Sequence, residues 1–145
     1  MNKTNPTESF VLFELAGNTC GVRSKDVRSV ELAGHVTAVP NALPYVEGVT
    51  LTRGTIIPSI NLRTLFGFAA IPVDARARMV VVRSKARTVG MLVDSAREFT
   101  SIPTDAIQPL GERIAGLSPR FVEGIATLGN RSVLVLNLDE VMEEV

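Results

Sequence analysis

Cysteine, histidine and tryptophan are almost missing from this sequence, which has one cysteine, one histidine and no tryptophan among 145 residues. A single cysteine excludes an intrachain disulfide and fits a reducing compartment. The sequence also lacks the CxxC and HExxH spacings of zinc sites and the GxxxxGKS/T and GxGxxG loops that bind nucleotide phosphates. We therefore expect neither a metal ion nor a cofactor.

An excess of charge of one sign and a long apolar run are missing as well. Lys plus Arg and Asp plus Glu both total 15, whereas binding to nucleic acid phosphates needs a surplus of positive charge. Apolar runs such as Met79–Val82 and Val133–Leu136 are four residues long, far short of the roughly 20 residues of a membrane span. No apolar stretch near Met1 has the character of a signal peptide. We expect a cytoplasmic protein that binds no nucleic acid and does not insert into a membrane.

The chain offers few candidates for catalysis. A Cys20–His35 pair would need the fold to join a nucleophile to a base, and residues 34–36 are more simply an exposed turn. The acidic pairs at 139–140 and 143–144 fit the first turn and the solvated face of a helix. We therefore predict a binding protein and no enzyme, with a small barrel enzyme as the alternative.

A unit of the sequence occurs twice. Residues 45–49 (YVEGV) align with residues 121–125 (FVEGI) at an offset of 76, which continues without a gap for 22 positions. Residues 10–13 align with residues 79–82 at an offset of 69, in the same order along the chain. The difference of seven residues is an insertion, most simply within residues 108–118. Two gapless blocks in one order indicate an internal duplication.

Each copy has the pattern of about five short strands with closely spaced turns. Apolar runs at Phe10–Leu15 and Met79–Arg83 lead through polar turns into a second strand. Residues 24–32 can open with a helical turn, and Ser118-Pro119 fits the start of another that Gly124 ends. Asn61 and Asn137 stand where a side chain would cap a brief helix.

This pattern predicts an all-β fold of two packed small β-barrels of about five strands each, with short helical turns. We expect a flexible N-terminus over residues 1–8, a first lobe over 9–73 and a second lobe over 78–145, with strands that can cross between lobes. A barrel of about 65 residues is marginal alone, so the two should pack together and leave a groove as the place for a binding site.

Two basic features need an interpretation. Residues 76–87 hold five Lys or Arg residues without interleaved aromatics, which fits the solvent face of a hairpin better than a nucleic acid platform. Arg53-Gly54 lies between two apolar strands, where Gly supplies the backbone freedom of a tight turn. Arg53 is either an ordinary exposed turn residue or an anchor for a partner protein.

Residues 45–63 (YVEGVTLTRGTIIPSINLR) resemble the signature of the CheW family, φ-φ-x-G-φ-x-N-L-R-G-x-φ-φ-P-φ-φ-D-φ-R with φ for an apolar residue. Residues 89–94 (VGMLVD) and 121–125 match the same family in the same order. The resemblance implies two SH3-like barrels, in agreement with the duplication. It also implies a bacterial adaptor that couples the tip of a methyl-accepting chemoreceptor to the regulatory domain of a CheA-type histidine kinase in chemotaxis or motility.

By the same resemblance the receptor contact includes Arg53 and the adjoining Gly54, with Val27 and Val30 beside the groove between the barrels. The kinase-facing surface is left unassigned. The family's Asn-Leu before Arg-Gly is Leu51-Thr52 here, and its acid after Val27 is Ser29. Glu31 can take the place of that acid if the segment is extended, because it would then face the same side as Ser29.

The departures keep two further interpretations open. One is a divergent, receptor-specific adaptor that binds the receptor but not the kinase. The other is a regulatory domain separated from a larger kinase-like protein. The sequence also ends at Val145, before the longer C-terminal helix common in the family.

Overall fold

The computed structural model describes residues 6–109 and 118–145 of the chain. The expected flexible N-terminus falls outside the described residues over 1–5, and the expectation was wrong for Thr7 and Glu8, which are paired in the first strand. Glu8 also forms an ion pair with Arg23 at 2.8 Å, which fixes this end of the strand. Most of the predicted insertion, over residues 110–117, lies outside the described residues.

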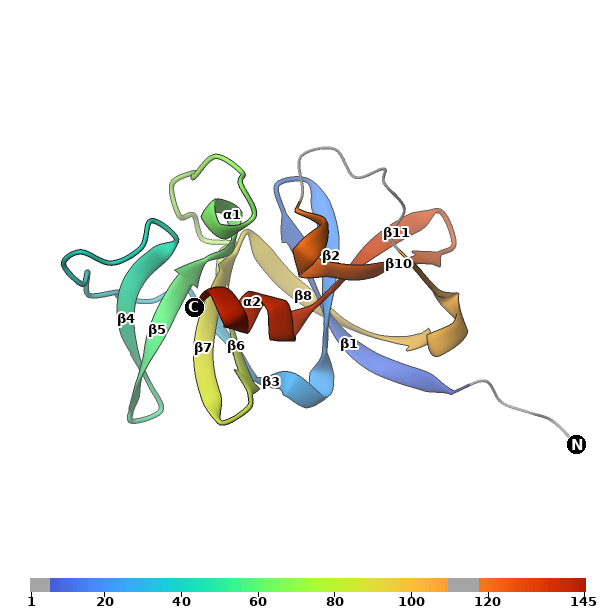
Figure 1. Cartoon of the computed structure of the whole chain (residues 1–145), viewed down its shortest axis with the longest axis horizontal. Coiled ribbons are helices and arrows are strands. Elements are labelled where there is room, and N and C mark those ends of the chain that lie inside the picture. The colour runs from blue at the N-terminus through green and yellow to red at the C-terminus, as the bar shows by residue number, and fades with distance from the viewer. Residues whose placement is uncertain (1–5, 110–117) are drawn as a thin grey trace, which may run out of the picture.

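The described part of the chain consists mainly of two β-sheets in which most strand pairs are antiparallel (Figure 1). We call the barrel of the six-stranded sheet barrel A, and its order is β8-β1-β2-β11-β10-β9. Its strands are β1 (Thr7–Leu15), β2 (Asn18–Arg23), β8 (Ser95–Pro103), β9 (Ile107–Pro109), β10 (Val122–Leu128) and β11 (Arg131–Leu136). We call the barrel of the five-stranded sheet barrel B, and its order is β3-β6-β7-β5-β4. Its strands are β3 (Val27–Leu32), β4 (Val46–Thr52), β5 (Thr55–Asn61), β6 (Arg78–Ser84) and β7 (Arg87–Val93).

The barrels do not divide the chain at the boundaries of the repeat. Strand β3 follows β2 in sequence but pairs with β6, and β8 follows β7 but pairs with β1. Barrel B is therefore continuous from Val27 to Val93, and barrel A is assembled from the segments before and after it. This differs from lobes over 9–73 and 78–145, because each repeat places its opening hairpin in one barrel and its remaining strands in the other.

The repeated glycine of the VEG motif marks the same irregularity in both copies. The pairing of β4 with β5 shifts between Val46 and Gly48, and the pairing of β10 with β11 shifts between Val122 and Gly124. A Cβ on Gly48 would lie 2.0 Å from the carbonyl oxygen of Thr37, and one on Gly124 would lie 2.6 Å from that of Gln108. Only glycine allows these close approaches, which explains why both copies carry it.

The apolar side chains form three clusters that follow the alternation of the strands. Phe10 and Leu12 of β1 point into barrel A, whereas Val11 and Phe13 point to the larger cluster that both barrels share. A small third cluster, which includes Met79 and Val81, lies inside barrel B. Since the shared cluster is the largest, the two barrels form one packed body.

Short helices complete this shared core. α1 (Leu62–Leu65) and α2 (Leu138–Glu144) begin after the predicted caps, because Asn61 accepts a hydrogen bond from the N–H of Thr64 and Asn137 from that of Glu140. Three 3₁₀ turns cover Ser24–Asp26 (η1), Thr104–Ala106 (η2) and Pro119–Phe121 (η3). The turn at η3 ends at Phe121, not at Gly124, because Val122 already starts β10.

Candidate functional site

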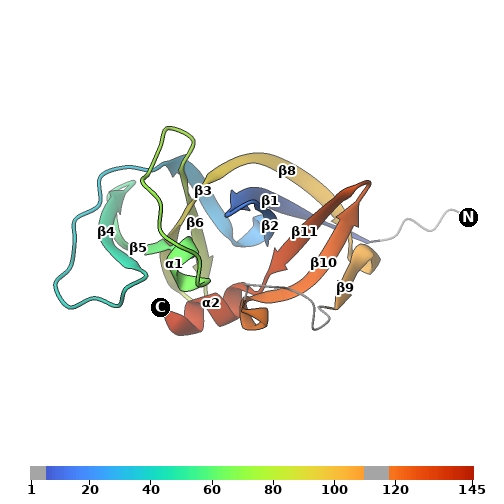
Figure 2. The ribbon, with the colours of Figure 1, turned by 90° about the horizontal axis from the view of Figure 1, so that it is seen from above.

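The strands β3 and β8 cross between the barrels, because each follows a strand of one sheet and pairs in the other. Val27 and Val30 lie opposite Val82 and Val80 in the pairing of β3 with β6, so they join the cluster that both barrels share. Figure 2 shows β3 and β8 along one side of the molecule and α2 on the opposite side. Val27 and Val30 therefore lie beside the junction of the barrels.

Phe99, which was not predicted from the sequence as a site residue, belongs to β8 on this side of the molecule. Phe99 of β8 lies opposite Val11 in the pairing with β1, and its side chain is 70% exposed. It is the counterpart of Val30 in the repeat, at the same offset of 69 that aligns the first strands. That offset is the signal by which Phe99 could have been found. We call Val27, Val30 and Phe99 the crossing face; Ala96, the counterpart of Val27, is buried in the shared cluster.

The opposite side of β3 belongs to a different surface. Ser29 and Glu31 lie opposite Val81 and Met79, which belong to the cluster inside barrel B, and the Ser29 hydroxyl donates to Glu31 Oε2 at 2.7 Å. The two side chains thus share one side, as expected for an extended segment. Glu31 lines a hollow of ≈ 280 Å³ between β3 and β4.

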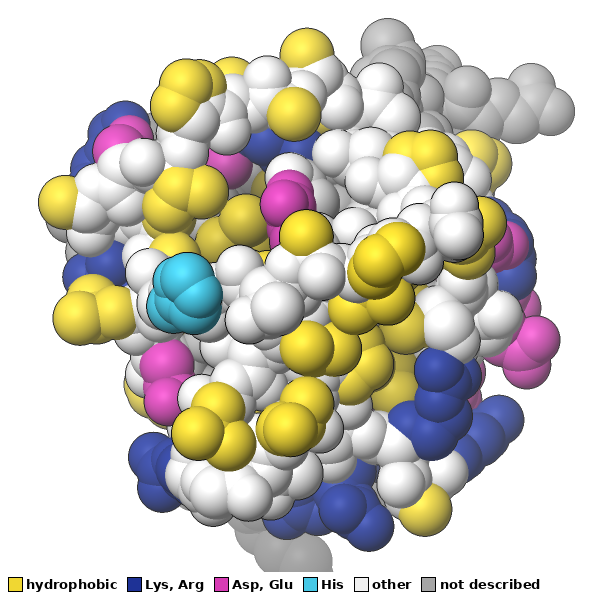
Figure 3. Space-filling view, turned by 90° about the vertical axis from the view of Figure 1, so that its left-hand side faces the viewer, with side chains coloured by type: hydrophobic (Ala, Val, Ile, Leu, Met, Phe, Trp, Pro, Cys, Tyr) yellow, Lys and Arg dark blue, Asp and Glu magenta, His cyan; other side chains and the backbone are white. Residues whose placement is uncertain are grey.

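Arg53 and Gly54 form the tip of the β4–β5 hairpin beside this hollow. Both are exposed, with φ values of 49° and 80°, and Leu51 and Ile56 face each other directly behind them. Leu51 is 70% and Ile56 69% exposed, unusually high values for large apolar side chains next to a turn. Figure 3 shows hydrophobic side chains on the side of barrel B that carries β4, with Lys and Arg along its lower edge. The residues of this hairpin surface are Glu31, Leu32, Leu51, Arg53, Gly54 and Ile56.

The predicted site is consequently divided in two. Val27 and Val30 belong to the crossing face, whereas Glu31, Arg53 and Gly54 belong to the hairpin surface on the other side of β3. The β-strand alternation makes this separation unavoidable, because neighbouring residues of β3 must point to opposite sides of their sheet.

A second hollow of ≈ 280 Å³ lies where α1 and the segment after it meet the β1–β2 turn. At its wall Arg63 donates two hydrogen bonds to Asp94, at 2.8 and 2.7 Å, and the N–H of Ala16 donates a third at 2.9 Å. Burial disfavours the charged form of Asp94, but the hydrogen bonds from Arg63 and Ala16 outweigh it and lower the pKa of Asp94. The hydrogen bonds of Asp94 thus join α1, which follows a strand of barrel B, to the β1–β2 turn of barrel A. We call Arg63, Asp94 and the Ala16 N–H the clamp between the barrels.

Cys20 and His35, the residues considered for catalysis, lie in different environments, the first buried and the second exposed. Burial, with smaller contributions from Glu14 and Asp94, raises the pKa of Cys20 to about 12, so the thiol stays protonated near neutral pH. His35 lies exposed in the segment between β3 and β4. Within residues 6–109 and 118–145, no three His, Cys, Asp or Glu side chains are arranged to hold a metal ion. The described helices are all too short to cross a membrane.

The fold and these surfaces define a class of protein: two SH3-like barrels packed into one body, with large apolar side chains exposed on its surface. Residues 9–145 match the CheW-like domain, and the chain belongs to that family.

Relatives and a solved structure agree with this assignment. The chain is 26% identical to the chemotaxis protein CheW of Klebsiella aerogenes over 135 residues, covering 93% of this chain and 81% of that protein. It is 23% identical to the chemotaxis protein CheW of Bacillus subtilis, covering 94% and 88% respectively. It is 26% identical to the protein FrzA of Myxococcus xanthus, covering 74% and 67%. The crystal structure of the scaffolding protein TtCheW from Thermoanaerobacter tengcongensis is similar with a TM-score of 0.85 at 27% identity, covering 91% of this chain and 90% of that one.

Proposed function

We propose that this chain is a CheW-type adaptor that couples chemoreceptors to a CheA-type histidine kinase. The observation that carries the proposal is the presence of two separate surfaces on one packed body: the crossing face, where Phe99 is exposed and Val27 and Val30 are half-buried, and the hairpin surface. An adaptor that holds two partners at once needs two such surfaces, and a rigid core between them fixes the relative orientation of the partners.

The crossing face fits the tip of a receptor, a hairpin of two α-helices. A helix presents an apolar stripe, and Val27, Val30 and Phe99 offer apolar side chains along two strands that cross between the barrels. Phe99 is the strongest single candidate for this contact because an exposed aromatic side chain gains most from being buried by a partner.

The hairpin surface fits the second partner, the regulatory domain of the kinase. Leu32, Leu51 and Ile56 supply an apolar centre, and Arg53 supplies a charged group at its rim. This proposal moves Arg53, Gly54 and Glu31 from the receptor contact implied by the sequence to a separate contact. It retains Val27 and Val30 at the receptor.

Pull-downs with the receptor tip and the kinase regulatory domain, separately and together, test the proposal. We expect Phe99→Glu to reduce receptor binding at least about tenfold and to leave kinase binding intact, since hot-spot losses of about 2 kcal/mol are common. Arg53→Glu should do the reverse. Arg131→Glu, at an exposed ion pair of barrel A, is the matched charge-reversal control. Loss of receptor binding by Arg53→Glu alone would restore the single-site interpretation.

A receptor-specific adaptor is the second candidate, favoured by the replacement of the family's Asn-Leu with Leu51-Thr52 beside Arg53. It predicts receptor binding without kinase binding in separate titrations. A ternary complex of all three proteins would exclude it. In either case we place the protein in the cytoplasm, recruited to its receptor.

A further inference from the structure

The cations of the two barrels differ in how they are neutralised. In barrel A and η3, Arg23, Arg120 and Arg131 each form an ion pair with a glutamate. Five cations of barrel B and its entry turn form no ion pair and donate no side-chain hydrogen bond to any other described residue. They are Lys25, Arg28, Arg53, Arg83 and Lys85. We call these five residues the basic end.

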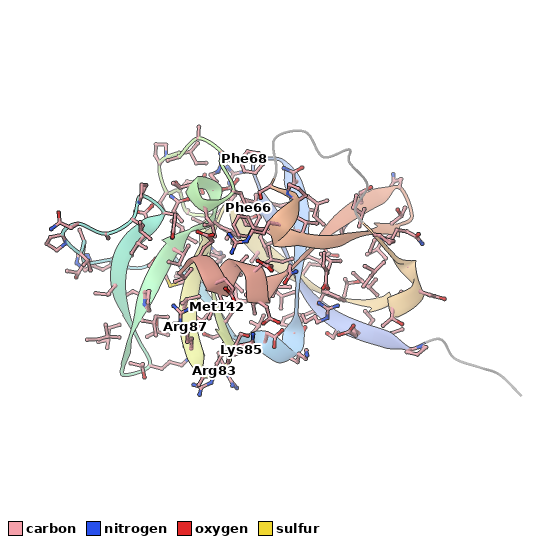
Figure 4. The ribbon with its side chains drawn as sticks, in the orientation of Figure 1. Phe66, Phe68, Arg83, Lys85, Arg87 and Met142 are labelled. Carbon is pink, nitrogen blue, oxygen red and sulfur yellow. The ribbon has the colours of Figure 1, made fainter. Side chains whose placement is uncertain are left out.

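The topology brings the basic end together at one end of barrel B. Strands β5 and β7 run parallel, so the turn before β5, which holds Arg53, and the turn before β7, which holds Lys85, lie at the same end. Val27 lies opposite Val82, so the η1 turn just before Val27, which holds Lys25, lies at the end of β6 where Arg83 follows, and Arg28 is the next residue of β3. Figures 1 and 4 show both the β4–β5 and the β6–β7 turn at the lower end of the molecule, with Arg83 and Lys85 at the second of them.

The backbone at both turns is unfavourable for the residues that occupy it. Arg53 and Lys85 each have φ = 49°, a conformation that Gly and Asn adopt at much lower cost. The equivalent turns of barrel A, Ala16-Gly17 and Gly129-Asn130, carry no charge. The duplication thus supplies its own comparison, because the same two turns are neutral in one barrel and cationic in the other. Ala16 and Gly129 of barrel A also have positive φ values, 50° and 64°, so the turn geometry is common to both barrels and the charge at the tips is what distinguishes barrel B.

The surroundings of the basic end select the class of partner. Leu51 and Ile56 stand directly behind Arg53, so the charges border an apolar surface, as at a protein interface. On the other side Ser84 donates to Asp139 at 2.9 Å, and Glu143 lines the same hollow as Lys85. These acids would repel a uniform polyanion such as nucleic acid or an anionic membrane, whereas a partner with a few separate carboxylates can avoid them.

We propose that the basic end is a docking surface for an acidic segment of a partner protein, in which carboxylates meet Arg53, Arg83 and Lys85 while apolar side chains cover Leu51 and Ile56. This rests on the second contact proposed above, with which it shares Arg53, Leu51 and Ile56, and it adds Arg83, Lys85 and the acidic chemistry of the partner segment. It also explains how a chain with zero formal net charge can attract an acidic partner to one end.

The test uses the full chain and a labelled helical peptide that carries Glu and Leu on one face, with a second peptide in which every Glu is Gln. Fluorescence anisotropy should show binding of the Glu peptide only, and its affinity should fall as salt shortens the screening distance from roughly 10 Å at 0.1 M. Arg83→Gln with Lys85→Gln should weaken binding about three- to tenfold, because two rim charges are lost. Arg131→Gln, which removes a paired cation of barrel A, should leave binding unchanged.

Several outcomes overturn the proposal. They are equal binding of the two peptides, no binding of either, or an unchanged affinity for the double variant. Binding of a 20-base oligonucleotide or of phosphatidylserine vesicles in preference to the peptide also overturns it, because the class of partner would then be wrong. These results are independent of the pull-downs above, since the double variant leaves Phe99 and Leu51 in place.

Discussion

Replacing Asp94 should expose how strongly the barrels are held together. The Asp94 carboxylate follows β7 and accepts hydrogen bonds from Arg63 in α1 and from the N–H of Ala16 in the β1–β2 turn. It therefore connects barrel B, the crossing strand β8 and barrel A through one side chain. Asp94→Ala removes all three bonds and leaves the guanidinium without its partner.

The structure sets the size of the effect. The side chains of Arg63 and Asp94 are 17% and 23% exposed, so solvent screens them only in part. A hydrogen bond to a charged group contributes about 1.5–3 kcal/mol, and bonds that share one acceptor are not additive. We expect Asp94→Ala to cost about 2–3 kcal/mol, which is a fall in Tm of roughly 5–10 °C for a chain of this length. Asp94→Asn keeps an acceptor for Ala16 and should cost about half as much.

The stability that Asp94→Ala loses relative to the wild type should become smaller at acid pH. Because the folded-state pKa of Asp94 is lowered, its stabilisation is fully present above the unfolded pKa of about 3.9 and is lost as pH falls through the folded value. The difference between the wild type and Asp94→Ala should therefore be constant near neutrality and shrink in acid.

Urea unfolding at neutral pH and in acid measures both effects. Arg63→Met and the double variant complete a cycle whose coupling energy should exceed about 1 kcal/mol. Asp74→Ala is the control, because its ion pair with Arg76 is exposed and should contribute nothing measurable. Additive single variants, or an Asp94→Ala loss no larger than that of the control, would refute the clamp.

Three further outcomes follow from single positions. In thermal unfolding, Gly48→Ala should lower the free energy of unfolding by about 3 kcal/mol, because its Cβ would meet the Thr37 carbonyl oxygen. Gly54→Ala has open space around its Cβ and should cost only about 1 kcal/mol, the penalty of its positive φ. Ser59 is fully buried and its hydroxyl finds no partner among the described residues, so Ser59→Ala should be neutral or stabilise by up to about 1 kcal/mol in urea unfolding. Cys20 should resist iodoacetamide at mildly alkaline pH until urea unfolds the protein; rapid alkylation of the folded chain would contradict its burial.

Local features of the fold could be predicted because short stretches of sequence determine them. Asn61 and Asn137 cap α1 and α2 as expected, since a capping side chain reaches only three residues along the chain. The strand runs were predicted for the same reason, because alternation of apolar residues is visible within each strand.

Strand partners could not be predicted in the same way. Strand pairing joins segments that are far apart in the sequence. Nothing in Val27–Leu32 itself therefore indicates that β3 pairs with β6 and not with the β1–β2 hairpin that precedes it. The division of the site follows from this exchange. Val30 and Glu31 are neighbours in sequence, but pairing with β6 directs one to the barrel junction and the other to the mouth of barrel B.

The duplication is most informative where its two copies differ. Val30 and Phe99 occupy equivalent positions on the crossing strands, but the second is the larger and more exposed, so a partner that spans both strands meets an asymmetric surface. The equivalent turns differ in charge in the same way, with Arg53 and Lys85 in barrel B against glycine and alanine in barrel A. Two equal barrels would bind two copies of one partner. Unequal surfaces on a shared core are what an adaptor for two different partners requires.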